Sequence, residues 1–203
     1  MIGILRGYFL SVKWSFAVAG SVIVFISVFF MLIPAITMHW TISMIVILSS
    51  LSATIDGTMA LSCWGKPICI MPVKKHVVIL ARYIFVGLPI IVGAVLSFLL
   101  SVLFGGAYTN FTMFVVGSAF ILSAFIVPFV LSKGMDGLFW GILMGLGVAA
   151  GLWVAVGGNV WLFTELDFTH GHMWFLYFLA GIVVYVGSYL TLIIAIRKGL
   201  PWN

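Results

Sequence analysis

The chain has 203 residues, of which 65% are hydrophobic and 6% are charged; nine Lys or Arg against four Asp or Glu give a net charge of +5. Soluble domains carry about 25% charged residues, so this composition excludes a soluble domain and a disordered chain. With two Cys it also excludes a secreted disulfide scaffold, and it is typical of a polytopic membrane protein.

Six apolar runs follow one another along the chain. The predicted spans are residues 14–34, 40–55, 77–104, 111–131, 138–160 and 173–196. A helix of about 20 residues crosses a membrane, and continuous apolar runs lack the alternation of a membrane β-barrel. The predicted fold class is therefore all-α, a single transmembrane domain over residues 1–203 with six transmembrane helices.

Residues 1–13, before the first span, mix apolar positions with Arg6 and Lys13. This pattern favours a short interfacial helix lying on the inner leaflet. A frayed N-terminus whose positive charges anchor the chain is the alternative.

The basic residues set the orientation. With six spans, all nine fall on one side of the membrane: Arg6, Lys13, Lys66, Lys74, Lys75, Arg82, Lys133, Arg197 and Lys198. Because cytoplasmic loops are enriched in Lys and Arg, both termini are predicted to be cytoplasmic. Five or seven spans would place basic residues outside. The positive net charge thus indicates how the chain is oriented in the membrane, and nucleic-acid binding is not predicted.

The longest predicted cytoplasmic segment is the loop of residues 56–76, DGTMALSCWGKPICIMPVKKH. It opens on Asp56, is broken at Gly65-Lys66-Pro67, and ends after Pro72, which disfavours helix before it. Its apolar residues need burial, either on lipid headgroups and the protein's own helices or against a soluble partner.

Three segments of the chain resemble small ABC exporter permeases of the type-2 class. Residues 71–83, MPVKKHVVILARY, resemble the family's signature at the start of the third helix. Residues 128–134, PFVLSKG, resemble its turn after the fourth helix, and residues 188–198 resemble its terminal helix and basic tail. The acidic-Gly pair and the Trp of the preceding loop resemble the same family.

The resemblance implies a permease subunit in the bacterial cytoplasmic membrane, exporting peptide or drug, whose loop docks a coupling helix onto a separate ABC ATPase. The implied coupling residues are Asp56, Gly57, Met59, Trp64, Lys66, Pro72, Lys74 and Lys75. ATP and magnesium would belong to the partner, since this chain has no phosphate-binding loop of the form GxxxxGK[ST]. No catalytic residues are predicted, and the chain is not expected to be an enzyme.

Two G-x-x-x-G pairs lie in the fifth predicted span, Gly141 with Gly145 and Gly147 with Gly151. Small residues let helices approach closely in lipid. Packing within the chain and a subunit interface explain them equally well, and the resemblance favours a dimer of permeases.

The predicted extracellular loop, residues 161–172, contains Glu165, Asp167, His170 and His172. Histidine and carboxylate side chains bind zinc, but His170-x-His172 alone is a weak metal motif. We favour a short amphipathic lid on the outer leaflet, with no metal.

Ionisable residues are almost absent from the spans; Arg82 is near enough to the inner end of its span to snorkel. Ion coupling is therefore disfavoured, and a hydrophobic or amphipathic cargo is expected. One alternative is the six-helix substrate-capture subunit of a vitamin importer, although the first span offers only Ala17 and Ala19 for the expected docking face. A membrane immunity protein without transport activity is the other.

Overall fold

The computed structural model of the chain describes residues 75–103, 109–133, 135–155 and 171–198. The predicted interfacial helix, the first two predicted spans and the loop up to Lys74 lie outside these ranges. So does the predicted outer loop up to His170. The fold is therefore given for the helices that follow the predicted coupling loop.

Four α-helices make up the described part of the chain. They are α3 (Lys75–Leu103), α4 (Thr109–Lys133), α5 (Met135–Ala155) and α6 (Gly171–Arg197). Each is long and apolar enough to cross a membrane. Even α5, with 21 residues, extends over about 32 Å, comparable to a hydrocarbon core of about 30 Å. The helical prediction is confirmed for these four spans, whose length and composition are those of membrane-spanning helices.

The helices begin two or three residues before the predicted spans 77–104, 111–131, 138–160 and 173–196. The extra residues are polar at several starts, for example His76, Asn110 and Asp136. Hydropathy marks the part of a helix in hydrocarbon, whereas the backbone continues as helix into the interface. Asp136 also lies in the first turn of α5, where a negative charge interacts favourably with the helix dipole.

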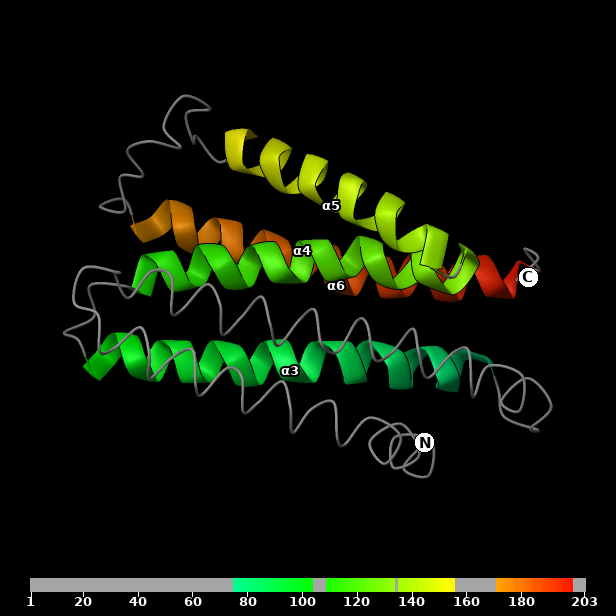
Figure 1. Cartoon of the computed structure of the whole chain (residues 1–203), viewed down its shortest axis with the longest axis horizontal. Coiled ribbons are helices and arrows are strands. Elements are labelled where there is room, and N and C mark those ends of the chain that lie inside the picture. The colour runs from blue at the N-terminus through cyan, green and yellow to red at the C-terminus, as the bar shows by residue number, and fades with distance from the viewer. Residues whose placement is uncertain (1–74, 104–108, 134, 156–170, 199–203) are drawn as a thin grey trace.

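Successive helices run in opposite directions (Figure 1). The start of α3, the end of α4, the start of α5 and the end of α6 therefore lie together, at the right of the view. Lys75, Lys133 and Arg197 occupy the helix termini there, and we call this the basic end of the bundle. The other end, where α3 finishes and α4 begins, is called the far end.

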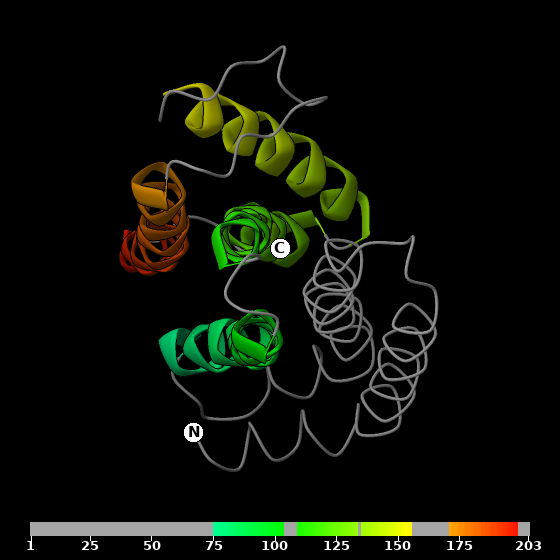
Figure 2. The same ribbon diagram turned by 90° about the vertical axis from the view of Figure 1, so that its left-hand side faces the viewer.

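Helix α4 lies in the middle of the described helices and contacts each of the other three (Figure 2). Its most apolar stretch is 61% buried, against 44% for α3, 11% for α5 and 6% for α6. Exposed side chains such as Phe139 on α5 and Val183 on α6 are apolar, as lipid-facing residues are. The contacts that hold the described bundle together are thus concentrated on α4.

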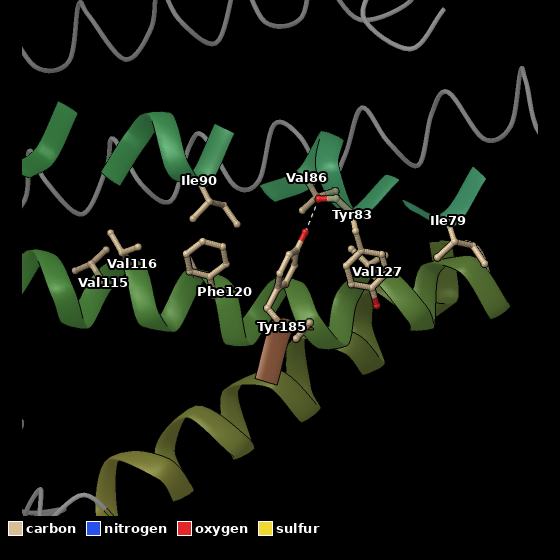
Figure 3. Packing of buried hydrophobic residues seen from close by; sticks show 11 residues of the cluster. Ile79, Tyr83, Val86, Ile90, Val115, Val116, Phe120, Val127 and Tyr185 are labelled. Carbon is tan, nitrogen blue, oxygen red and sulfur yellow. Dashed lines mark hydrogen bonds between the residues drawn. The ribbon is translucent and has the colours of Figure 1, made fainter. Parts of the chain in front are cut away.

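Buried apolar side chains form two clusters around α4. The first, shown in Figure 3, joins α3, α4 and α6 through Ile79, Tyr83, Val86, Ile90, Val115, Val116, Ala119, Phe120, Ala124, Val127 and Tyr185. The second joins α4, α5 and α6 through Ile121, Ala149, Trp153, Trp174 and Tyr177. Both clusters take residues from α4 and α6, so these two helices share most of the described interior.

Helices α4 and α6 meet backbone to backbone at Gly117 and Gly181. A Cβ atom added at Gly181 would lie 2.6 Å from the Gly117 carbonyl oxygen and 3.0 Å from the Gly117 Cα. Neither backbone can move away without disturbing a whole helix. The lack of a side chain at Gly181 is therefore what permits this packing, as small residues do in membrane bundles.

Gly181→Ala is expected to lower the free energy of unfolding by about 1–3 kcal/mol, because the new methyl group overlaps the α4 backbone. Gly187→Ala is the matched control on the same helix, since a Cβ there meets nothing within 4 Å. It should change stability by less than about 0.5 kcal/mol. Denaturant titration of the purified chain in detergent micelles, followed by helical circular dichroism, measures both. Equal effects would contradict the close α4–α6 contact.

Candidate functional site

The predicted coupling residues from Asp56 to Lys74 lie outside the described ranges, whereas Lys75 begins α3. The described helix that continues directly from the predicted coupling loop is therefore α3.

Of the two weak metal candidates, His172 is the second residue of α6, and His170 lies outside the described part. Within the four described helices no group of three or more His, Cys, Asp or Glu is placed to hold a metal ion.

The two G-x-x-x-G pairs of α5 have different surroundings. A Cβ at Gly141 would lie 2.7 Å from the Cα of Ile126, and one at Gly145 would lie 3.1 Å from the Cα of Leu122. The first pair thus packs on α4. A Cβ at Gly147 or Gly151 would meet nothing within 4 Å. The second pair lies on an open face of α5.

A carbonyl freed by proline lies where α4 meets α6. Pro128 has no N–H, so α4 cannot form the usual bond from residue 128 to the carbonyl of Ala124, four residues earlier. Ser188 of α6 donates its hydroxyl to this same carbonyl, with Oγ and O 2.5 Å apart. A neighbouring helix thus supplies the donor that Pro128 lacks, as serine and threonine do for other prolines in membrane helices.

Tyr83 of α3 extends this hydrogen bond to a third helix. Its hydroxyl lies 2.8 Å from Ser188 Oγ. Ser188 has one hydroxyl proton and gives it to Ala124, so Tyr83 is the donor and Ser188 the acceptor. The chain Tyr83 to Ser188 to Ala124 therefore runs from α3 through α6 to α4.

Tyr185 makes a second bond from α6 to α3. Its hydroxyl donates to the backbone carbonyl of Tyr83 at 2.6 Å, the dashed line in Figure 3. Gly87 leaves room for it, since a Cβ there would lie 3.2 Å from the Tyr185 hydroxyl. The rings of Tyr185 and Tyr189 lie 5.2 and 5.3 Å from that of Tyr83. We call Tyr83, Tyr185, Ser188 and the Ala124 carbonyl the hydroxyl junction.

A separate tyrosine, Tyr177 of α6, bonds away from α3. Its hydroxyl lies 3.1 Å from Ser118 Oγ of α4 and 3.4 Å from the Ala149 carbonyl of α5. Its ring belongs to a stack of aromatic side chains, in which the Trp153 and Trp174 centroids are 4.5 Å apart. This group joins α4, α5 and α6 without contributing to the hydroxyl junction.

Hydroxyl groups also lie at the far end of the α3–α4 pair. Ser101 Oγ and Thr109 Oγ1 are 3.1 Å apart and join the end of α3 to the start of α4. Ser97 and Thr112 are fully buried nearby along the same two helices. Helix α3 is therefore held to α4 at the far end by residues close in sequence.

In the four described helices, charged residues lie almost entirely at the termini. Between the end turns of the four described helices, Arg82 is the one Lys, Arg, Asp or Glu in the sequence, about two turns after Lys75. The described interior thus offers hydroxyls and aromatic rings, which hydrogen-bond and pack.

Sequence reasoning did not single out the hydroxyl junction. Tyr83 and Ser188 appeared only as parts of the family-like segments, and Pro128 only as part of a turn. The available signal was Pro128 itself, because a proline inside an apolar span frees the carbonyl four residues earlier. Its donor could not be chosen, since hydropathy does not say which serine of another span faces it.

Comparisons of the chain with protein-family models, with curated proteins and with solved structures found no match. The resemblance to ABC exporter permeases therefore depends on the sequence segments alone. The hydroxyl junction stands on the geometry of α3, α4 and α6 and does not need the resemblance.

Ser188→Ala is expected to lower the free energy of unfolding by about 0.6–1.7 kcal/mol, the range of interhelical hydrogen bonds in membranes. Pro128→Ala restores an N–H for the Ala124 carbonyl. In that background Ser188→Ala should lose about half of its effect or more. Unfolding of the four variants in bicelles gives this double-mutant cycle.

Pro89→Ala is the matched control for the cycle, because it restores an N–H in α3 and not in α4. Ser188→Ala should keep its full effect in the Pro89→Ala background. The same cost of Ser188→Ala in all three backgrounds would show that Pro128 does not govern this hydrogen bond.

Proposed function

We propose that this chain is the transmembrane permease subunit of an ATP-driven exporter of the ABC type. It would cross the bacterial cytoplasmic membrane six times, with both termini in the cytoplasm. The observation that supports this best is the distribution of charge: the described helix termini with Lys or Arg gather at one end, and α3 enters the bundle there. By the excess of basic residues in cytoplasmic segments, the basic end faces the cytoplasm.

The cargo proposed for this exporter is hydrophobic or amphipathic, such as an antimicrobial peptide, a drug or a lipid-like molecule. The supporting observation is the hydroxyl and aromatic character of the described interior, where Arg82 is the sole charged residue between the end turns. Cells that lose the protein should become sensitive to amphipathic peptides or drugs. Unchanged resistance to them would contradict this cargo.

The energy for transport would come from a separate ABC ATPase that binds ATP and magnesium. The docking site proposed for it is the loop between the second and third spans, through Asp56, Trp64 and the other coupling residues. The loop leads into α3 at the basic end, so a force on the loop acts first on α3.

A second permease subunit would complete the transporter. The part of the described surface that suits it is the open face of α5 with Gly147 and Gly151, because small residues allow another helix to approach closely. Gly141 and Gly145 are already packed on α4. The mass of the purified complex counts the permease chains: two are expected, and a single chain would contradict the dimer.

Copurification with an ABC ATPase coexpressed from the same genome tests the exporter. The natural chain should carry the ATPase through purification and support ATP turnover. Asp56→Ala and Trp64→Ala should each weaken the complex, since both change the proposed docking loop. Trp140→Ala is the matched control, a tryptophan that is 48% exposed on α5 and distant in sequence from the loop. It should copurify normally.

Three outcomes distinguish the candidates. Normal complexes of both loop variants would contradict the coupling role of the loop. Capture of a vitamin by the chain without ATPase would favour the importer subunit. Immunity in cells without any ATPase partner would favour a protein that shields its host without transport.

A further inference from the structure

We propose that Tyr83 and Ser188 are positioning residues whose hydrogen bond holds the basic end of α3 against the α4–α6 pair. We call this contact the latch. When the ATPase displaces the loop before α3, the movement is transmitted to the bundle by the breaking and re-forming of the latch. The coupling part of this inference depends on the proposed function. The latch itself is a property of the described helices.

The position of the latch follows from the chain. Tyr83 lies about two turns after Lys75, where α3 enters the bundle from the loop. It is 4% exposed, and its hydroxyl and its carbonyl both bond to α6, through Ser188 and Tyr185. A displacement of the start of α3 must therefore break or carry along these two hydrogen bonds.

The order in which contacts break follows from the donor directions. When α3 moves away, Ser188 loses the hydrogen bond that Tyr83 donates to it but keeps its own bond to the Ala124 carbonyl. That bond has no competitor from α4, because Pro128 lacks an N–H. The link between α6 and α4 thus survives the opening of the latch.

The α4–α6 pair is also fixed by the contact of Gly117 with Gly181, where the backbones meet. Helix α3, in contrast, contacts α4 and α6 much less extensively than these two helices contact each other. At the far end the bond between Ser101 and Thr109 ties α3 to α4 across a short link. The part of α3 nearest the basic end can therefore move relative to α4 and α6 while its far end stays attached to α4.

Allosteric coupling requires an element with two arrangements that both sites bias. The latch provides one, since closing it forms two interhelical hydrogen bonds and opening it exposes two hydroxyls and a carbonyl. Such bonds have modest strength in membranes, so an external force can shift the balance. The ATPase would supply that force through the loop.

Spin-label distances between α3 and α6 test the latch. Labels are placed at Leu88→Cys and Val183→Cys, which are 57% and 69% exposed and lie outside the junction. Cys63 and Cys69, the two natural cysteines, are changed to Ser. The distance distribution is recorded in bilayers for the chain alone, and for its complex with the ATPase before and after addition of ATP and magnesium.

Tyr83→Phe and Ser188→Ala should each raise the population with α3 displaced by about three- to seventeenfold in the chain alone, and should abolish the change caused by ATP. Tyr177→Phe is the matched control. It removes a tyrosine hydroxyl that also bonds to a serine, but one that joins α4, α5 and α6. It should leave both measurements as in the natural chain.

Natural distributions in Tyr83→Phe and Ser188→Ala would overturn the latch, whether or not an ATPase binds. If the α3–α6 distance distribution of these two variants is broadened but still changes when ATP is added, the coupling part alone would be overturned. A natural chain that never binds the ATPase would overturn the proposed function and the coupling with it, while the distribution in the chain alone would still decide the latch.

Discussion

The hydrogen bond from Ser188 to the Ala124 carbonyl is the interaction on which the described arrangement depends. Inside hydrocarbon a carbonyl without a hydrogen-bond partner is unfavourable, and Pro128 removes the usual partner of one in the central helix. Ser188 removes this cost only when α6 lies against α4 with one face turned inward. The proline thus favours the packing of α6 against α4. Ser188 of α6 is then in place to accept a hydrogen bond from Tyr83.

The rest of the packing follows from a lack of hydrophobic force between helices in lipid. Association there depends on close contact and on hydrogen bonds, because lipid chains are as apolar as leucine side chains. Close contact comes from Gly117 and Gly181 between α4 and α6, and from Gly141 and Gly145 between α5 and α4. Hydrogen bonds come from tyrosines that reach across helices. Helix α3 is joined to α6 by two such hydrogen bonds and by the apolar cluster around Tyr83.

The amino-acid sequence predicted the described helices well, because each apolar run is as long as a membrane is thick. Helix starts were predicted too late by two or three residues, since polar residues such as Asn110 continue the helix outside the hydrocarbon. The six-span count and the orientation remain predictions, because residues 1–74 lie outside the described ranges.

The candidate site was harder to predict because it depends on which faces meet. Gly141 and Gly147 are six residues apart, which turns the helix by about 240° and places them on different faces, yet spacing alone does not say which face packs inside. The partnership of Tyr83, Ser188 and Ala124 joins residues far apart in sequence. Predicting it requires the rotation of three helices about their axes.

The central claim is that the Ala124 carbonyl accepts its hydrogen bond from Ser188. Isotope-edited infrared spectroscopy of the chain in bilayers, with a ¹³C=¹⁸O label at Ala124, observes this carbonyl directly. The account predicts that Ser188→Ala shifts the labelled band to higher frequency, because the carbonyl loses its donor, and that Ser118→Ala leaves the band in place. An unshifted band in Ser188→Ala would contradict it.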